Sequence, residues 1–268
     1  MSLLNIDNGI SLITTVCNRE ASLRRVLASW LGIINVSQIV IVDWSSTTSS
    51  EEYVRSLQSK KILYIYVENQ RFFNIAQAKN LASQFSKYNS LLFLDADILL
   101  KDSFFLEHRV GEGCFYAGNW RIARSENEMH LNGQLYIQRS DFFEVNGYDE
   151  RFNSYGWDDS DLYHRLEINK FILRYAKYLS FQIFWKVPLM GGLKRLNINP
   201  ECLEHIPHED QDRTINYPVT NVSPKDSIEE NKVTSSLRVP WNRSFTQTPY
   251  QVIQSSASFY KLRKIIEE

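Results

Sequence analysis

The chain has 268 residues, of which 43% are hydrophobic and 23% charged, a balance that is ordinary for a globular protein with a substantial core. Its formal net charge is −1, so it lacks the excess of Lys and Arg that marks a nucleic-acid-binding protein. Three widely spaced cysteines match neither a zinc site nor a disulfide framework, which favours a reducing compartment.

The sequence also gives no sign of a targeting or membrane-spanning segment. Met1–Asn8 has no basic stretch followed by an apolar core, so we expect no signal peptide. A run of about 18 apolar residues is missing, so we expect no transmembrane segment. These features favour a cytoplasmic protein that works in solution or at the inner face of a membrane.

The first hundred residues alternate between apolar, β-rich runs and segments in which apolar residues recur at helical spacing. Strands that alternate with helices in this way predict parallel β-α-β units and therefore an α/β sheet. The expected strands are Gly9–Val16, Gln38–Val42, Lys61–Val67 and Leu91–Leu94, and the expected helices are Glu20–Leu31, Ser49–Leu57 and Asn74–Phe85.

Polar residues follow the ends of these strands. Asn18 and Arg19 come after the first strand, Asp43 after the second, and Asp95–Asp97 after the fourth. In open α/β sheets, ligands bind beyond the carboxyl ends of the strands. The sequence therefore predicts a ligand site at this edge of the sheet.

The stretch Leu91–Leu100, LLFLDADILL, places two carboxylates within an apolar run. Burying them is costly unless a positive charge compensates them. Residues i and i+2 of a strand point the same way, so Asp95 and Asp97 could converge on one cation, and their oxygen atoms suit Mg²⁺ or Mn²⁺. Alternatively, the strand ends here and Asp97 caps the next segment.

Beyond Lys101 the pattern becomes less regular, and shorter elements are expected. They are helices at Phe104–Val110 and Ser140–Val145, strands at Cys114–Asn119, Gly133–Gln138 and Phe171–Leu179, a loop around Pro188 and Gly191–Gly192, a polar surface arm at Arg213–Val239, and a closing helix at Ser256–Ile266.

The segment Gly147–Leu166, GYDERFNSYGWDDSDLYHRL, is dense in acids and aromatics. Three acids, Asp158, Asp159 and Asp161, precede apolar residues at helical spacing and so occupy the first turn of a helix. The helix dipole favours acids there, and capping of free N–H groups alone could explain them. The preceding Gly156–Trp157 favours a sugar site, because an aromatic ring beside carboxylates is a usual way to hold a sugar.

Two histidines, His205 and His208, lie three residues apart in the segment HIPHEDQD. They could supply an imidazole ligand to the cation expected at Asp97, although a surface histidine often has no such role. The other histidines have no partner in sequence and are expected to be structural or exposed, namely His108, His130 and His164.

Together these groups resemble the GT-A fold nucleotide-sugar glycosyltransferases, both the bacterial inverting enzymes of family two and the animal β-1,4-galactosyltransferases. Gly147–Leu166 is similar to the galactosyltransferase segment NG(F/Y)-(D/P)-x-x-(Y/F), which continues with WGWG-(G/E)-E-D-D-D and an (I/L)-(F/Y)-x-R-L helix. The resemblance extends from about Ser11 to His208. Its other motifs are Asp43 with Ser45 and Ser46, an Asn-x-Ala-x-x-Lys-Asn helix at Asn74–Asn80, and the D-x-D at Asp95–Asp97.

The resemblance implies a Rossmann-like, mostly parallel central sheet with flanking helices and a smaller acceptor-side portion. It also implies a role for each matching residue. Asp159 matches the catalytic base. Asp97 and His208 match the ligands of a Mn²⁺ or Mg²⁺ ion, and His205 falls where the galactosyltransferases have Met as a further ligand. Acceptor-side residues are Trp157, Asp158 and Ser160, and nucleotide-sugar-binding residues are Asn18, Arg19, Asp43, Arg71, Phe72, Asn74, Asp95 and Gly133.

The sequence departs from the family in two places near the acceptor and donor sugar. The Gly-rich lead-in is reduced to Tyr155-Gly156-Trp157, and one family acid is Ser160. The resemblance implies a glycosyltransferase domain over residues 1–212, with a nucleotide-binding half (1–100) and an acceptor or catalytic half (101–212). Residues 213–268 would form a C-terminal arm.

The implied activity is metal-dependent, inverting transfer of a hexose or N-acetylhexosamine from a UDP-sugar to a hydroxyl of a glycan or lipid-linked saccharide. A retaining glycosyltransferase, a sugar nucleotidyltransferase of similar fold, and a non-catalytic sugar-binding domain remain open at this point.

Overall fold

The computed structural model describes residues 9–111, 113–152, 156–179, 192–207, 228, 231–232 and 250–265, and between residues 169 and 179 it describes the backbone alone. The predicted loop at Pro188 and most of the predicted arm lie outside these residues. Within the described part of the chain, no helix is long and apolar enough to cross a membrane.

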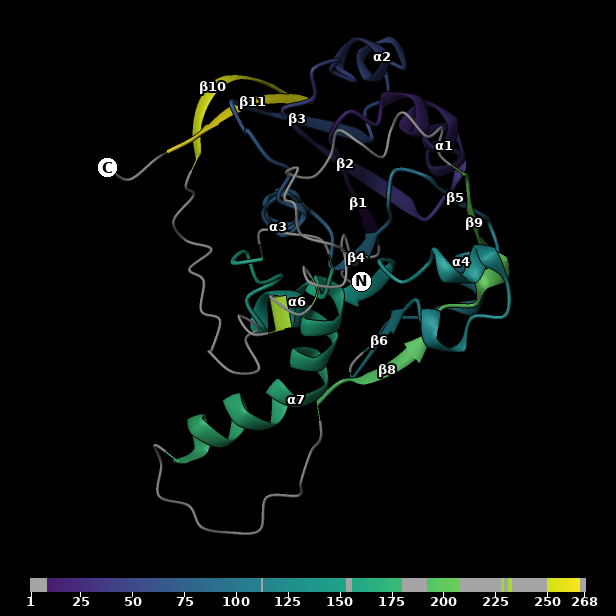
Figure 1. The fold of residues 1–268 in the computed structure, drawn as a ribbon, viewed down its shortest axis with the longest axis vertical. Coiled ribbons are helices and arrows are strands. Elements are labelled where there is room, and N and C mark those ends of the chain that lie inside the picture. Colours follow the sequence, from purple (N-terminus) through teal and green to yellow (C-terminus); the bar gives the residue numbers. More distant parts are fainter. Residues whose placement is uncertain are drawn as a thin grey trace, which may run out of the picture.

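A nine-stranded sheet runs through the whole molecule (Figure 1). Its central strands pair in parallel, which confirms the predicted α/β class, and the antiparallel pairs lie toward the two edges. In spatial order the strands are β10 (Tyr250–Ser256), β11 (Phe259–Lys264), β3 (Ile62–Glu68), β2 (Val36–Trp44), β1 (Ile10–Val16), β4 (Ser90–Phe93), β7 (Leu135–Gln138), β6 (Cys114–Ala117) and β8 (Lys194–Asn197).

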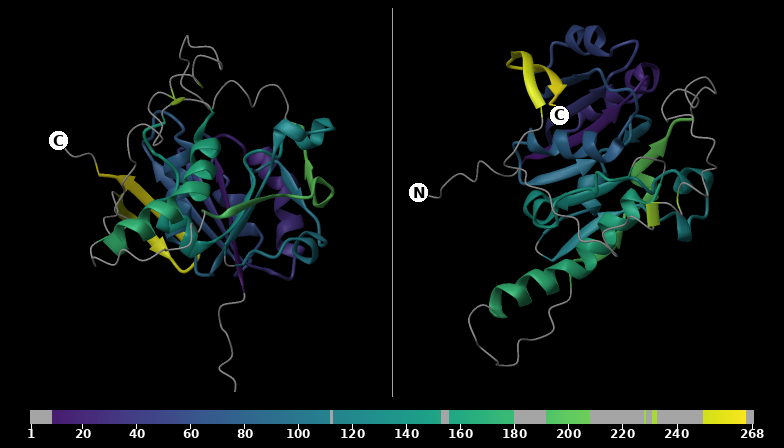
Figure 2. Two further views of the ribbon diagram at one scale, coloured as in Figure 1. Left: turned by 90° about the horizontal axis from the view of Figure 1, so that it is seen from below. Right: turned by 60° about the vertical axis from the view of Figure 1, so that its left-hand side comes forward.

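Both faces of this sheet are covered, because neighbouring residues of each central strand belong to different apolar cores. Leu12 of β1 packs in the core that contains helix α1 (Glu20–Gly32), whereas Ile13 packs in the core that contains helix α3 (Ile75–Gln84). Alternation of this kind follows from the two-residue period of a strand. The two helices therefore lie on opposite faces of the sheet (Figure 2).

The remaining elements are shorter, apart from one long helix, and most of them lie around the β4–β7–β6 part of the sheet, whereas α2 lies beside β3. Helix α7 begins against this part and then extends beyond the sheet (Figure 1). The elements are α2 (Glu51–Ser56), α4 (Phe104–Glu107), α5 (Glu126–Met129), α6 (Arg139–Glu144), α7 (Asp158–Leu179), the 3-10 turns η1 (Trp120–Ile122) and η2 (Pro200–Cys202), and a second, two-stranded sheet of β5 (Ile98–Leu100) and β9 (Leu203–His205).

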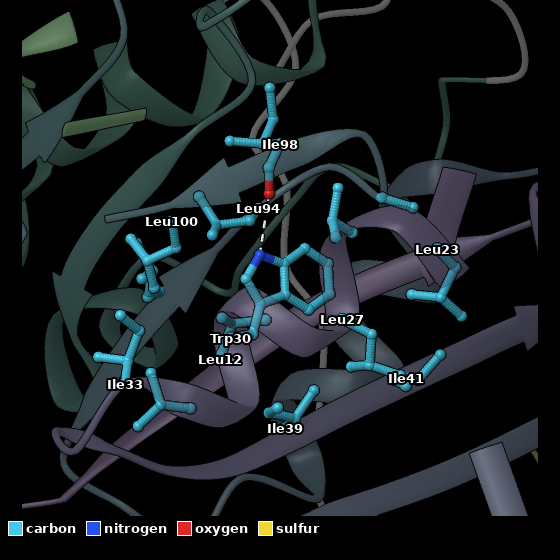
Figure 3. Close-up of a cluster of buried hydrophobic side chains, with 14 of the residues drawn as sticks. Leu12, Leu23, Leu27, Trp30, Ile33, Ile39, Ile41, Leu94, Ile98 and Leu100 are labelled. Atoms are coloured by element: carbon cyan, nitrogen blue, oxygen red, sulfur yellow. Dashed lines mark hydrogen bonds between the residues drawn. The ribbon is translucent and has the colours of Figure 1, made fainter. Parts of the chain in front are cut away.

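Trp30 anchors α1 in the apolar core on one face of the sheet (Figure 3). Its side chain is fully buried among Leu12, Leu94 and other aliphatic residues. The indole Nε1 donates a hydrogen bond of 2.9 Å to the carbonyl oxygen of Ile98, the first residue of β5. A buried indole N–H needs such a partner, and in meeting this need it fixes the strand that follows Asp97.

Two predicted elements are wrong. Phe171–Leu179 is not a strand but the second half of helix α7. A short apolar run is compatible with either structure, and no Gly or Pro interrupts the chain between Trp157 and Leu179.

The predicted closing helix at Ser256–Ile266 is instead the hairpin of β10 and β11. Phe259 and Leu262 are buried, and their i, i+3 spacing is also compatible with a helix. The segment forms a strand instead, because β11 pairs in parallel with the edge of β3 and Phe259 stacks on Tyr64 at a centroid distance of 6.1 Å. A tertiary contact thus overrides the local pattern.

Candidate active site

The loops after β1, β2 and β3 are joined by hydrogen bonds of their polar side chains. The backbone N–H of Asn18 donates to Ser46 Oγ, and Asn18 Oδ1 accepts from the backbone N–H of Thr47, both at 2.8 Å. Ser45 Oγ donates to the carbonyl of Val67 at 2.6 Å and accepts from the N–H of Gln70 at 2.8 Å. Asn18, a predicted nucleotide-sugar-binding residue, thus belongs to a set of hydrogen bonds that connects the three loops.

Asp43, predicted to lie at the nucleotide, is fully buried. It accepts hydrogen bonds from the backbone N–H groups of Ser46 (2.9 Å) and Ser50 (3.3 Å) and from the hydroxyl of Tyr64. Burial raises the pKa of this carboxyl, and these hydrogen bonds oppose the rise. Asp43 therefore organises the loop that begins α2, and its contact with a nucleotide stays a prediction.

The segment after β3 contains two predicted nucleotide-sugar-binding residues next to each other, Arg71 and Phe72, and a third, Asn74, that caps a helix. Arg71 is exposed over the ring of Phe72, whose side chain is 49% exposed. Asn74 caps α3, because its Oδ1 accepts from the N–H of Gln77 at 2.8 Å. Its Nδ2 donates to the carbonyls of Glu150 and Phe152, so Asn74 also ties α3 to the loop before α7.

The D-x-D lies in a turn between β4 and β5, because β4 ends at Phe93. The N–H of Ile98 donates to the carbonyl of Asp95 at 3.1 Å and closes this turn. The strand geometry that we invoked for Asp95 and Asp97 is therefore wrong. The carboxylates are nevertheless close enough to interact, since burial and then Asp95 raise the pKa of Asp97 to about 7, while Arg19 opposes the rise.

Gln134 holds Asp95 through two hydrogen bonds. Its Oε1 accepts from the backbone N–H of Asp95, and its Nε2 donates to Asp95 Oδ2, both at 2.9 Å. The neighbouring Gly133 leaves the space above this carboxylate open. A Cβ atom there would lie 2.9 Å from Asp95 Oδ2 and 3.5 Å from Asp159 Oδ2. The two carboxylates therefore face a common space beside Gly133.

The first turn of α7 brings Asp158 and Asp159 against Lys79 of α3. Lys79 is 4% exposed, and its Nζ lies 3.5 Å from Asp159 Oδ1. The hydroxyl of Tyr148 donates to the same oxygen at 3.4 Å. Burial, followed by the charge of Asp158, raises the pKa of Asp159 to about 7, and Lys79 opposes the rise. Asp159 is thus a carboxylate whose raised pKa would suit a general base that works near neutral pH.

The loop that carries Tyr148 is fixed by Asn80, the last residue of the Asn-x-Ala-x-x-Lys-Asn motif. Asn80 Oδ1 accepts from the N–H of Tyr148, and its Nδ2 donates to the Tyr148 carbonyl, both at 2.8 Å. Gly147 has a φ of 63°, and a Cβ there would lie 2.3 Å from Asn80 Oδ1, so only Gly fits. The motif therefore serves to join α3 to the site loop.

Two family models match the chain in succession. Residues 11–112 match the model for glycosyl transferase family 2, and residues 120–183 match the model for the N-terminal domain of galactosyltransferase. No curated protein sequence matches the chain significantly. Among solved structures, the catalytic domain of Drosophila β1,4-galactosyltransferase 7 with xylobiose covers 97% of this chain and 95% of its own, at 12% identity and a TM-score of 0.60.

A mutant of the same Drosophila enzyme, in complex with manganese, UDP-Gal and xylobiose, gives 13% identity, the same coverage and a TM-score of 0.58. Likeness at this level of identity establishes the fold over nearly the whole chain, and the family models add the class of enzyme. The chain is a glycosyltransferase of the GT-A fold.

The residues of the glycosyltransferase that are predicted to face the acceptor lie at the start of α7, and one of them contacts a segment from the C-terminal part of the chain. Trp157 has a φ of 73°, and the ammonium of Lys232 lies 4.9 Å from the centre of its ring. Asn231 is buried and donates to the carbonyl of Gly156 at 2.7 Å. Ser160 is half-buried on the first turn of α7. The roles of Trp157 and Ser160 at an acceptor stay predictions.

The predicted metal ligands are only partly described. His208 lies outside the described residues. His205 is the last residue of β9, pairs with Ile98 across the second sheet, and stacks on His130 at a centroid distance of 3.9 Å. Beside it, the N–H of Ile206 donates to the carbonyl of Asp97 at 2.8 Å. Among the described residues, no three His, Cys, Asp or Glu side chains are grouped closely enough to hold a metal ion.

The carboxylate oxygens at the D-x-D turn could supply part of the ligands of a divalent cation. Two carboxylates share this turn, and their repulsion contributes to the raised pKa of Asp97. A cation would relieve that repulsion, and carboxylate oxygens suit Mn²⁺ and Mg²⁺. His205 and His208 are the further predicted ligands, and of these two only His205 lies within the described residues.

From the sequence, no individual role is predicted for three residues of this site, Lys79, Gln134 and Tyr148, although Lys79 and Tyr148 lie within segments that carry the family resemblance. Lys79 carried a signal, because it lies three residues from Ala76 and from Ala82, which are both buried. A lysine on the buried face of a helix needs an anionic partner. Gln134 and Tyr148 gave no such signal, since each is an ordinary residue next to a Gly.

Proposed function

We propose that this glycosyltransferase transfers a hexose or N-acetylhexosamine from a UDP-sugar to a hydroxyl of a glycan or lipid-linked saccharide, with inversion at the anomeric carbon. The observation that carries the proposal is the position of Asp159. Its Oδ1 contacts Lys79 and Tyr148, and its Oδ2 faces the open space beside Gly133 that Asp95 also faces. The complex of the Drosophila enzyme with UDP-Gal and xylobiose supports this choice of donor and acceptor class.

In the proposed reaction, Asp159 takes the proton of the acceptor hydroxyl as its oxygen attacks the anomeric carbon. The bond from that carbon to the diphosphate oxygen breaks, and the electron pair leaves with UDP. The transition state has oxocarbenium character, as in glycoside hydrolysis. A single base on the side opposite the leaving group gives inversion. Asp97, with His208 and His205 as the further candidates, would hold a divalent cation, which neutralises charge on the leaving diphosphate.

The base is tested with Asp159→Asn. A carboxamide keeps the shape but cannot take a proton, so we expect transfer to fall about 10²–10⁴-fold while UDP-sugar binding, measured by calorimetry, stays nearly unchanged. Glu167→Gln is the matched control, since Glu167 is exposed on the same helix two turns away. Full activity of Asp159→Asn would show that Asp159 is not the catalytic base.

Product analysis in the same assay separates the other reaction classes. NMR of the product shows whether the anomeric centre is inverted, as proposed, or retained. Release of pyrophosphate instead of UDP would indicate a nucleotidyltransferase. A domain that only binds sugar would show neither product nor slow donor hydrolysis in the absence of acceptor.

The cation is tested by removing it and by changing its proposed ligand. We expect EDTA to abolish transfer and excess Mn²⁺ to restore it, because the leaving diphosphate then regains its counter-charge. Asp97→Ala should remove activity and abolish Mn²⁺-dependent donor binding, which calorimetry measures directly. A metal-free enzyme with full activity would refute this site.

A further inference from the structure

Lys79 is a buried cation among the acids of the site and has no role in the mechanism described so far. It comes from α3, whereas its neighbours come from the D-x-D turn and from the first turn of α7. Its Nζ lies 3.5 Å from Asp159 Oδ1 and 4.9 Å from the centre of the Tyr148 ring. Three elements of the fold thus meet at this ammonium.

The charges around Lys79 keep it protonated. Burial disfavours the ammonium, but the attraction of Asp159, Asp95 and Asp158 outweighs burial and raises the pKa of Lys79. The reverse effect is also present, since Lys79 lowers the pKa of Asp158 and of Asp159 against their burial. A cation held in this way cannot serve as an acid or base near neutrality, so its contribution must come through its neighbours.

The two oxygens of Asp159 have different surroundings. Oδ1 meets both donors, the Lys79 ammonium and the Tyr148 hydroxyl at 3.4 Å. Oδ2 lies on the side of Gly133, 3.5 Å from where a Cβ of that residue would be, and this is the side on which Asp95 lies. One oxygen is therefore anchored by the protein, and the other faces the space where the reacting groups would meet.

We propose that Lys79 is a positioning residue for glycosyl transfer, which with Tyr148 anchors Oδ1 of Asp159 so that Oδ2 receives the proton of the acceptor hydroxyl. This inference rests on the proposed function of Asp159. In the step, the proton moves from the acceptor oxygen to Oδ2, the acceptor oxygen bonds to the anomeric carbon, and the bond from that carbon to the diphosphate breaks, so that UDP leaves with the electron pair. Lys79 keeps its proton throughout.

The adjacent Asn80 explains why the anchor is rigid. Lys79 and Asn80 are consecutive, and Asn80 holds both backbone groups of Tyr148. The two donors to Oδ1 are therefore fixed relative to each other by one turn of α3. A carboxylate held at one oxygen loses less freedom in the transition state than one that must be oriented during the reaction.

Lys79→Met tests the inference, because it removes the charge and keeps most of the length of the side chain. We expect kcat for transfer to fall about 10–10²-fold, with the Kd of the UDP-sugar changed less than about threefold. The acidic limb of the pH–rate profile should move up by about one pH unit or more, since an opposite charge within about 4–6 Å lowers a carboxyl pKa by that much.

The pH of the acidic limb depends on all the titratable groups that face Asp159. These groups are Lys79 on α3, Asp95 at the D-x-D turn, Tyr148, and Asp158 and Tyr163 on α7. Only Lys79 changes in this variant. Lys79→Arg keeps the charge and should return the limb toward its original pH even if the rate recovers only in part. If Lys79 merely stabilised the fold, Lys79→Met would leave the pH of the acidic limb unchanged, and Lys79→Arg would have no shift to reverse.

Tyr148→Phe covers the case in which Lys79→Met does not fold. It removes the second donor to Oδ1 without changing a charge, and we expect kcat to fall at least about threefold with donor Kd unchanged. Wild-type rate and pH profile in Lys79→Met, or, if that variant fails to fold, wild-type rate in Tyr148→Phe, would overturn the anchor. Full activity in Asp159→Asn would instead overturn the proposed function, so the two failures are distinct.

Discussion

Asp159 has a pKa of about 7, mainly because it is buried and because Asp158 lies next to it. A base must be ionised to accept a proton, so activity should be lost as the pH falls below this value. We expect kcat/KM for transfer to rise about tenfold per pH unit below pH 7 and to level off above it. The measurement is a pH series of initial rates at limiting UDP-sugar concentration.

Donor binding over the same pH range is the control for this prediction. Asp97 also has a raised pKa, so a loss of binding at low pH would report on the donor side of the site rather than on the base. A rate that stays constant down to pH 5 while binding is unchanged would exclude Asp159 as the base.

Single residues show how far the sequence could predict the site. The strand-end acids Asp95 and Asp97 and the helix-start acid Asp159 stand out because acids are costly near an apolar core. Their partners do not stand out in the same way. Gln134 becomes important only because the antiparallel pairing of β7 with β4 places it beside Asp95, and pairing between distant strands cannot be derived from local spacing.

At the scale of elements, the turn with Asp95–Asp97 depends on helix α1 through Trp30. Trp30→Phe removes the donor to the Ile98 carbonyl and leaves a small cavity in the core (Figure 3). We expect it to destabilise the protein by about 2–4 kcal/mol, measured by urea unfolding. Amide hydrogen exchange across β5 should also become faster.

Ile34→Ala is the control for that variant, since Ile34 follows the same helix and is 89% exposed. Its effect on stability should stay within about 0.5 kcal/mol. Equal stability of Trp30→Phe and the wild type would show that the indole hydrogen bond does not hold β5.

The elements that the sequence predicted well are those with strong periodicity. The expected helix Glu20–Leu31 is observed as Glu20–Gly32, and the expected strand Gly9–Val16 as Ile10–Val16. The short pieces β5 and β9 were not predicted, because three residues carry too little pattern. Phe171–Leu179 failed for a related reason, since a short apolar run suits a helix as well as a strand.

At the scale of the whole molecule, the C-terminal hairpin supports the predicted donor side from the far edge of the sheet (Figure 1). Phe259 stacks on Tyr64, and the hydroxyl of Tyr64 donates to Asp43, which in turn holds the N–H groups of Ser46 and Ser50. The chain of contacts therefore runs from β11 to the loop after β2.

Phe259→Ala tests this connection. Removing a buried ring should destabilise the protein by about 3–5 kcal/mol in urea unfolding, and loosening of Tyr64 should raise the KM for the UDP-sugar more than it lowers kcat. Val252→Ala, at a half-exposed position of the same hairpin, should change neither quantity. An unchanged KM for the UDP-sugar in a folded Phe259→Ala protein would show that the hairpin does not influence donor binding.

The pairing of β11 with β3 has a consequence for the synthesis of the chain. Arg263 and Glu68, which form an ion pair across these strands, are 195 residues apart in sequence. During synthesis on the ribosome, β3 emerges long before β11, so the edge of β3 stays unpaired until β11 has been made. An open edge strand invites pairing with other chains. A nascent chain that lacks β11 is therefore expected to aggregate or to recruit chaperones, rather than to yield a slightly weaker enzyme.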